Sequence, residues 1–375
     1  MKSNDDLTKE ILLESVSKFA DLEIAQHWKF IDETGNLPEG LFAKMVNFGF
    51  LSLTIPEEYG GSGFDYDIAW KVVYEISKRS ASIGCILEGH YKTIDQIKRF
   101  ASDRLKEEYL PQGNERIFGF SSTEPSGGTT IRNMRTEAFY QDNHWILNGS
   151  KVMITNGGLA EVYCVIAKTG ENEFSCVLID MNMPGFEFGA RENFMGLLGC
   201  PVGTLFFDNI RVPEYHLLGQ RGQGLIIGDV AHYDARIYMG GLLAGAVKQA
   251  MDIAVSYALR SKTGSVQLSE IFPIQEKISN IAIIHKNILL LTNEAVRLRK
   301  CHKDYSEVAT MIKAYGSKAA FGAVDDSIQI LGGYGYSKEY PIEHILSDVR
   351  ALQLMEGSYE KMMYEISEEL TNEYK

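Results

Sequence analysis

The sequence lacks features that mark several large classes of protein. Its five cysteines are widely spaced and form no C-x-x-C pair, so neither a disulfide framework nor a zinc site is indicated. There is no basic block, and 37 Lys and Arg against 50 Asp and Glu give a formal net charge of -13. A surface of this kind repels nucleic acid and anionic lipid. We therefore expect no nucleic-acid partner.

The sequence also lacks long runs of apolar residues. The first residues, MKSNDDLTKE, are acidic and polar where a signal peptide would be basic and then apolar. The most apolar stretch, residues 278–291, is interrupted by polar side chains and is shorter than the roughly 20 apolar residues that span a bilayer. The sequence therefore predicts no membrane insertion and a cytoplasmic location.

Common catalytic signatures are absent as well. The chain has no G-x-S-x-G elbow, no H-E-x-x-H, no P-loop and no G-x-G-x-x-G, which disfavours the common hydrolase and nicotinamide-enzyme hypotheses. The segment Gly222–Gly228 approaches the dinucleotide fingerprint but has one residue too many and no β-α-β unit around it. The eight histidines show no ligand spacing, so we expect no metal site.

The periodicity of the apolar residues divides the chain into three parts. With 45% hydrophobic and 23% charged residues, it has enough apolar material for two or three cores. Apolar residues recur at helical spacing at the start, as in Leu12, Val16 and Phe19, and again after Gly224. Short β-rich runs lie between, and Asn148-Gly149 predicts a turn there. We expect an α+β multidomain chain with an α-helical domain over 1–117, a β domain over 118–222 and an α-helical bundle over 223–375.

Three local constellations could carry chemistry. The loop Phe120–Thr129 combines hydroxyl groups with bare backbone N–H groups that can wrap a polar ring edge or a phosphate. The segment Gln329–Tyr336 has three glycines after a predicted helix. Glu356 lies beside Leu354 and Met355, whose apolar side chains would raise its proton affinity by desolvation, as a general base requires. Taken singly, each has an ordinary alternative: a surface turn, a helix C-cap and a partly solvated glutamate.

Together and in this order, the constellations resemble the acyl-CoA dehydrogenase family of flavoproteins. The resemblance covers nearly the whole chain and rests on seven ordered motifs. These are IPEEYGGSG at 55–63, STEPSGG at 122–128, LNGSKVMITNGG at 147–158, FFDNIRVP at 206–213, LLGQRGQG at 217–224, QILGGYGY at 329–336 and MEGS at 355–358. The resemblance implies an N-terminal α-helical domain, a middle β-barrel or β-sandwich domain and a C-terminal four-helix bundle.

The resemblance also implies a reaction, which is FAD-dependent α,β-dehydrogenation of an acyl thioester. A base takes the α proton while the β hydrogen leaves as hydride to flavin N5, and Glu356 matches the usual base. Some relatives place the base just before the arginine that matches Arg236, but this chain has Ala235 there, which cannot act as a base. The backbone N–H of the base residue and a ribityl hydroxyl would hold the thioester carbonyl.

Further site residues follow from the resemblance alone. A homo-oligomer, usually a tetramer, is implied because Arg260 and residues 329–333 would reach the FAD of a neighbouring subunit, and an electron-transfer flavoprotein is the expected electron acceptor. The substrate side would include Thr129, Arg236 and Gly357. The cofactor side would include Phe120, Ser122, Thr123, Thr129, Met153, Ile154, Thr155, Arg260, Gln329, Gly332, Gly333, Ser358 and Glu360.

Several positions depart from the family pattern. Met153 stands where a tryptophan usually borders the flavin, and Thr130 where an aspartate usually follows the TEP loop. These changes favour a specialised substrate, such as an acyl, aminoacyl or prolyl group on a carrier protein in place of CoA. Two other hypotheses stay open: a flavin-dependent oxidase or monooxygenase on the same scaffold, and a non-catalytic scaffold member.

Overall fold

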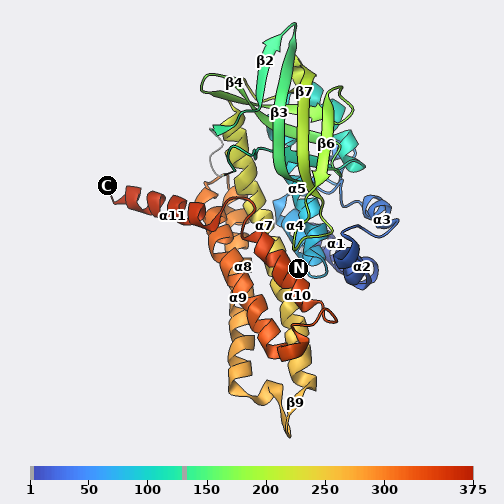
Figure 1. Cartoon of the computed structure of the whole chain (residues 1–375), viewed down its shortest axis with the longest axis vertical. Coiled ribbons are helices and arrows are strands. Elements are labelled where there is room, and N and C mark those ends of the chain that lie inside the picture. Colours follow the sequence, from blue (N-terminus) through green and yellow to red (C-terminus); the bar gives the residue numbers. More distant parts are fainter. Residues whose placement is uncertain (1–3, 129–132, 375) are drawn as a thin grey trace.

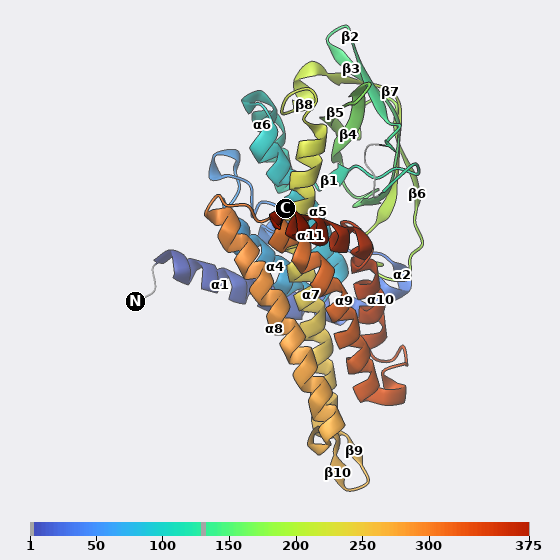
Figure 2. The ribbon, with the colours of Figure 1, turned by 90° about the vertical axis from the view of Figure 1, so that its left-hand side faces the viewer.

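The computed structural model describes residues 4–128 and 133–374, and the chain runs through three regions (Figure 1). A layer of helices comes first, a β-sheet follows, and a bundle of long helices ends the chain. Figures 1 and 2 show the sheet at one end of the long axis and a small hairpin at the other. The predicted order of helical, β and helical regions is confirmed.

At the centre of the N-terminal region lies α5, which packs against α4 and α6 and is buried along nearly its whole length. Ser80 caps its first turn by accepting a hydrogen bond from the backbone N–H of Ile83. His90 fixes α5 against the next region, because its Nδ1 accepts from the backbone N–H of Phe118 while its Nε2 bonds to the carbonyl of Leu51. The helices are α1 (Asn4–Phe19), α2 (Trp28–Thr34), α3 (Leu41–Phe48), α4 (Tyr66–Ser77), α5 (Ala81–Phe100) and α6 (Asp103–Tyr109), with short helical turns at Ala20–Ile24, Ala25–His27, Glu57–Tyr59 and Pro111–Asn114.

The middle region is a single eight-stranded sheet. Its strand order is β6-β7-β3-β2-β4-β5-β8, and β1 pairs in parallel with β4. The strands are β1 (Phe118–Ser121), β2 (Glu137–Gln141), β3 (His144–Thr155), β4 (Val162–Gly170), β5 (Glu173–Asp180), β6 (Phe186–Arg191), β7 (Val202–Pro213) and β8 (Leu217–Leu218).

The turn predicted at Asn148-Gly149 is wrong. Strand β3 runs through both residues, and the hairpin between β2 and β3 turns at Asp142 and Asn143, which both have positive φ. Gly149 instead lies where the register between β3 and β7 shifts. A Cβ on Gly149 would come within 2.7 Å of Thr136, so the glycine serves a close backbone approach at a bulge.

The C-terminal region is a bundle formed mainly by α7, α8, α9 and α10. Its helices are α7 (Gly224–Arg260), α8 (Phe272–Lys300), α9 (Ser306–Leu331), α10 (Ile342–Leu352) and α11 (Tyr359–Glu373), with a hairpin of β9 (Lys262–Thr263) and β10 (Val266–Gln267) and short turns at Leu268–Glu270 and Gly332–Tyr334. Helix α11 extends away from the bundle axis (Figure 1).

Helix α7 is long and apolar enough, by length and composition alone, to cross a membrane. This differs from the expectation based on residues 278–291. Half of its apolar window is buried inside the fold, where α7 packs against α4, α5, α8 and α9. Packing within the bundle therefore accounts for its composition.

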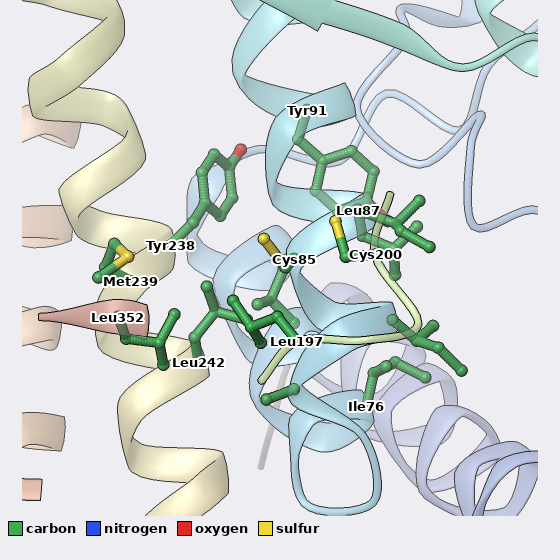
Figure 3. Close-up of a cluster of buried hydrophobic side chains, with 14 of the residues drawn as sticks. Ile76, Cys85, Leu87, Tyr91, Leu197, Cys200, Tyr238, Met239, Leu242 and Leu352 are labelled. Carbon is green, nitrogen blue, oxygen red and sulfur yellow. The ribbon is translucent and has the colours of Figure 1, made fainter. Parts of the chain in front are cut away.

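A continuous core joins the three regions (Figure 3). Figure 3 shows Cys85 and Tyr91 of α5 beside Cys200 from the segment before β7, with Tyr238 of α7 and Leu352 of α10 close by. All five side chains are buried. Helix α5 is thus held between the sheet region and the bundle, and its charged residues Glu88, Lys92 and Asp95 lie in the interior.

Candidate active site

Glu356 lies in a tight loop between α10 and α11. Both Glu356 and Gly357 have positive φ, 57° and 101°, so the chain turns sharply here. Ser358 then caps α11, because its hydroxyl accepts from the backbone N–H of Lys361. The turn directs the Glu356 side chain inward, where it is 8% exposed.

Two side chains from different helices hold the Glu356 carboxylate. Lys92 Nζ on α5 lies 2.6 Å from Oε1, and His232 Nδ1 on α7 lies 2.8 Å from Oε2. Burial alone would raise the pKa of this carboxyl, but the charge of Lys92 and the hydrogen bond from His232 outweigh burial and hold the pKa well below its usual range. Glu356 is therefore ionised at neutral pH.

The expectation that apolar neighbours raise the proton affinity of Glu356 is wrong. Leu354 points outward and is 61% exposed, so it does not desolvate the carboxylate. The charges that decide the pKa come from α5 and α7, which are distant in sequence. The neighbours in space, and not those in sequence, set the ionisation state.

Arg236 holds the backbone of the same loop. It lies one turn after His232 on α7, and its Nε donates to the carbonyl of Glu356 at 3.5 Å. Its Nη1 donates to the Thr310 hydroxyl at 2.7 Å. Gly357 has a φ of 101°, which L side chains rarely adopt, so the loop favours glycine at this position. Arg236 is thus buried against the loop, and the substrate contact expected for it stays a prediction.

Lys313 on α9 supports the helix that leads into the loop. Its Nζ donates to the carbonyl of Leu352, the last residue of α10, at 2.6 Å. Burial lowers the pKa of Lys313 to about 7, although the charge of Glu356 acts in the opposite direction. Keeping the Lys313 side chain protonated is unfavourable here, because burial removes water from its charge.

This buried lysine predicts a pH-dependent stability. The folded-state pKa of about 7 lies below the ordinary value of 10.5, so the unfolded chain binds more protons between these values and stability rises with pH in that window. The wild type should therefore gain about 2 kcal/mol of stability between about pH 7 and pH 9, and we expect Lys313→Met not to show this gain. Thermal melts of both proteins across this range measure it, with the exposed Lys318→Met on the same helix as the control. Parallel Tm curves for wild type and Lys313→Met would contradict the prediction.

Glu88 lies one turn before Lys92 on α5 and is fully buried. Its Oε1 is 3.4 Å from Lys92 Nζ. Neither of its carboxylate oxygens has a hydrogen-bond partner among the described residues. Burial raises the pKa of Glu88 to about 7, against the opposing charge of Lys92. Glu88, Lys92, Glu356 and His232 therefore form one connected cluster of titratable groups, which we call the charged cluster.

The loop that enters the sheet region is pinned by a second buried ion pair. Lys151 Nζ on β3 lies 2.7 Å from Glu124 Oε1 and 3.1 Å from the carbonyl of Ser122. Glu124 also accepts hydrogen bonds from the backbone N–H groups of residues 135 and 136. The backbone N–H of Val152 donates to the carbonyl of Thr123 at 3.0 Å. These bonds place Thr123 beside the last residues of β3.

The end of β3 lies against α5. Met153 has a positive φ of 57° and is 52% exposed, Ile154 is buried, and Thr155 is partly exposed. A Cβ on Gly89 of α5 would come within 3.3 Å of the Thr155 methyl group, so the bare glycine lets α5 approach this strand. Because Gly89 follows Glu88 directly, the charged cluster and the end of β3 adjoin the same part of α5.

The remaining predicted cofactor residues divide into two groups. Phe120 lies in β1 and Ser122 directly follows that strand, while Ser358 caps α11 and Glu360 lies in its first turn, near Glu356 in sequence. Thr129, predicted for both cofactor and substrate, lies outside the described residues. Arg260 ends α7 directly before β9, at the end of the bundle opposite the sheet (Figure 1).

Other predicted cofactor residues lie near Arg260 at the far end of the bundle. A cavity of about 570 Å³ adjoins Arg260, lined in part by Tyr257 and Tyr340. The rings of Tyr257 and Tyr340 both approach that of Tyr334, which lies in the glycine turn after α9. Three exposed residues lie in or just before that turn: Gln329, Gly332 and Gly333. Within one chain, the structure brings these residues near Arg260 and not near Glu356.

The residues missed by sequence reasoning are those of the charged cluster other than Glu356, together with the pinning pair. A signal was available for two of them, because Glu88 and Lys92 interrupt an apolar helix at a spacing of four residues. Charged residues on the buried face of a helix require partners. No local pattern identifies those partners as Glu356 and His232.

Three family models match the chain along almost its full length. They describe the acyl-CoA dehydrogenase N-terminal domain over residues 7–114, the middle domain over 119–210 and the C-terminal domain over 222–371. The chain belongs to the acyl-CoA dehydrogenase family. Its members are FAD-dependent oxidoreductases, and this chain is an FAD-dependent oxidoreductase of that family.

Relatives and solved structures agree with this assignment. The chain is 34% identical over 352 residues to an acyl-CoA dehydrogenase of Bacillus subtilis, covering 92% of this chain and 93% of that protein. A structure described as the electron transferring flavoprotein of Acidaminococcus fermentans aligns with a TM-score of 0.94 at 30% identity, covering 99% and 98% of the two chains. Butyryl-CoA dehydrogenase from Megasphaera elsdenii aligns with a TM-score of 0.94 at 26% identity, covering 99% of each chain.

The residues around the end of β3 suit a flavin. Thr123 and Thr155 are partly exposed residues, and a threonine hydroxyl can bond to the polar edge of a ring system. The exposed Met153 offers a soft apolar surface to a ring face. The pinned loop 122–128 presents glycine backbone without side chains. The residues present thus fit FAD.

Proposed function

We propose that this enzyme dehydrogenates an acyl thioester between its α and β carbons, with Glu356 as the base that takes the α proton. FAD, when bound, supplies the acceptor for the β hydrogen, which leaves as hydride. One observation carries the proposal: Glu356 holds an ionised, buried carboxylate beside the part of α5 that touches Thr155. An ionised carboxylate can accept a proton, and the fixed loop conformation directs it to one place.

The same proposal assigns the cofactor contacts. Thr123 and Thr155 would bond to the flavin ring edge, with Phe120, Ser122, Met153 and Ile154 around it. Ser358 and Glu360 would add contacts from the start of α11, and Thr129, Arg236 and Gly357 would adjoin the thioester. The backbone N–H of Glu356 would hold the thioester carbonyl.

We also propose that the enzyme is a homo-oligomer. Arg260, Gln329, Gly332 and Gly333 lie at the end of the bundle opposite the sheet (Figures 1 and 2). One chain cannot offer both this end and Thr155 to a single FAD. A second subunit that brings its bundle end to the first subunit's sheet would complete the site.

Finer features belong to the same proposal. The family assignment supports acyl-CoA as substrate, and a carrier-bound acyl, aminoacyl or prolyl group is proposed as an alternative thioester. An electron-transfer flavoprotein is the proposed electron acceptor, and the cytoplasm the proposed location. The domain limits at 117 and 222 also stay proposals.

The anaerobic visible spectrum tests the proposed reaction. We expect the oxidised flavin bands of the purified holoenzyme to bleach when a substrate acyl-CoA is added, because hydride transfer reduces the flavin. A panel of short- and medium-chain acyl-CoA esters, with free CoA as the control, ranks the acyl groups. Flavin that no acyl-CoA or carrier-bound acyl ester reduces would refute the proposal.

An oxidase or monooxygenase on this scaffold is the nearest alternative. Oxygen consumption during turnover separates the two, because a dehydrogenase passes its electrons to another protein and an oxidase passes them to oxygen. A non-catalytic scaffold is less favoured, because an unused site would not need a buried base held by two partners.

A further inference from the structure

The carboxylate of Glu356 is ionised, but its proton affinity is low. Against the effect of burial, the charge of Lys92 and the hydrogen bond from His232 hold the pKa of Glu356 well below its usual range. A general base works best when its pKa lies near the working pH. Removal of the α proton would therefore be faster if the interaction between Lys92 and this carboxylate were weaker.

Glu88 is placed to weaken that interaction. Its Oε1 lies 3.4 Å from Lys92 Nζ, so a single ammonium group lies between the carboxylates of Glu88 and Glu356. The side chains of Glu88, Lys92 and Glu356 are 0%, 6% and 8% exposed, so water and salt screen their charges little. Neither oxygen of Glu88 has a hydrogen-bond partner among the described residues. Lys92 is thus the group through which Glu88 can act on Glu356.

The charge on Glu88 changes near neutral pH. Burial raises the pKa of Glu88 to about 7, while the charge of Lys92 opposes this shift and that of Glu356 adds to it. Below this pH, Glu88 is neutral and Lys92 pairs with Glu356 alone. Above it, two carboxylates share one cation. Because coupling between titrating groups is reciprocal, an ionised Glu88 raises the pKa of Glu356 by as much as an ionised Glu356 raises that of Glu88.

We propose that Glu88 is a positioning residue that acts on the base through Lys92; the proposal rests on the proposed function, in which Glu356 takes the α proton. When Glu88 is ionised, Lys92 is shared between two carboxylates and Glu356 takes the proton more readily. When Glu88 is protonated, Lys92 pairs with Glu356 alone and proton removal is slower. This role requires no contact between Glu88 and the substrate. The rate of flavin reduction should therefore rise with pH as Glu88 ionises.

Two neighbours of the charged cluster do not change their charge near neutral pH. Cys85 precedes Glu88 by three residues on α5, and a hydrogen bond with Cys200 together with burial raises the pKa of the Cys85 thiol well above its usual range. The thiol therefore stays neutral. Arg236 on α7 donates to the Glu356 carbonyl and keeps its positive charge at every pH of interest.

Two other groups must be tested as the source of a pH effect, because each interacts with Glu356. His232 Nδ1 lies 2.8 Å from Glu356 Oε2, and histidines in general titrate near neutral pH. Burial lowers the pKa of Lys313 on α9 to about 7, and its charge interacts with that of Glu356. His232→Asn keeps a hydrogen-bond donor without an ionisable group, and Lys313→Met removes the lysine charge.

The pH dependence of flavin bleaching tests the role of Glu88. Stopped-flow bleaching of the holoenzyme at saturating acyl-CoA, from about pH 6 to about pH 9, gives the limiting rate on both sides of the expected transition near pH 7. We expect the wild-type rate to rise at least about threefold, because a coupling of about one pK unit changes the proton affinity of the base about tenfold and the proton-transfer rate by part of that factor. An ester deuterated at the α carbon should bleach the flavin more slowly at every pH, because proton removal limits the measured rate.

Variants of Glu88 identify the group that titrates. Glu88→Gln and Glu88→Leu should bleach at the low-pH rate of the wild type over the whole range, because neither new side chain ionises. Glu88→Asp should keep a rise with pH, since it keeps a carboxylate, and His232→Asn and Lys313→Met should keep it whatever their absolute rates. The exposed Glu107→Gln on α6 is the matched control and should behave as the wild type. FAD content and Tm confirm that each variant is folded.

The contrary outcomes are distinguishable. A rise that survives in Glu88→Gln and Glu88→Leu would overturn the role of Glu88, and so would a rise that is lost in His232→Asn or in Lys313→Met. A wild-type rate that does not change with pH, or a rise without the α-deuterium effect, would also overturn this role while the proposed reaction stands. If no acyl-CoA or carrier-bound ester reduces the flavin at any pH, the proposed function itself fails, and the role of Glu88 fails with it.

Discussion

The Glu356→Gln enzyme is expected to bind FAD as the wild type does and to lose flavin reduction by substrate. Glutamine has the same shape and can still accept from Lys92, so the loop should keep its conformation. It cannot take a proton, and removing a general base typically lowers a rate by about 10² to 10⁴. Because proton removal and hydride loss are linked in the proposed reaction, we expect a loss of at least about 10³ in the bleaching rate.

The measurement is stopped-flow bleaching with a saturating acyl-CoA ester, together with the flavin-to-protein absorbance ratio. Glu368→Gln on the exposed part of α11 is the matched control, because it removes a carboxylate near in sequence but outside the site. Undiminished bleaching in Glu356→Gln would show that another group takes the α proton. Loss of FAD together with activity would instead assign Glu356 a structural role.

The order of the three regions could be predicted because each has its own periodicity. Residues such as Leu12, Val16 and Phe19 repeat at the spacing of a helix, and α1 forms where they lie. The hairpin turn could not be placed, because Asn148-Gly149 carries the same local signal as a turn and is used for a bulge within β3. Local propensity does not distinguish the two, since both require a residue that tolerates positive φ.

The site was only partly accessible from sequence. Glu356 stands in a motif that resembles a family, so its position could be predicted. Its ionisation could not, because Lys92 is 264 positions away in the chain and reaches it only once α5 is buried between sheet and bundle. The prediction from its sequence neighbours, Leu354 and Met355, gave the wrong direction for the pKa shift of Glu356. A pKa depends on neighbours in space, which periodicity does not provide.

The buried pair Lys151 and Glu124 gives the second large prediction. Both side chains are almost fully buried, at 0% and 2% exposed, and Lys151 also bonds to the Ser122 carbonyl. Lys151→Met would leave the Glu124 carboxylate without its cation, which typically costs about 3 to 5 kcal/mol in a buried site. We expect a clear fall in Tm and a large loss of FAD from the purified protein, because the loop that carries Thr123 loses its anchor.

The double variant Glu124→Gln with Lys151→Met separates two effects of losing Lys151: the unpaired charge of Glu124 and the lost packing of the lysine side chain. Neutralising both partners of a buried ion pair is often nearly neutral for stability, whereas removing one is not. The N–H groups of residues 135 and 136 donate to different oxygens of Glu124, and the single amide oxygen of glutamine can accept from one of them, so the loop keeps one of these two bonds. We therefore expect the double variant to recover much of the Tm and FAD content lost in Lys151→Met. If the two variants are equally impaired, lost packing of the lysine side chain, and not the unpaired carboxylate, is the cause. If Lys151→Met retains full FAD and Tm, the ion pair does not hold the loop.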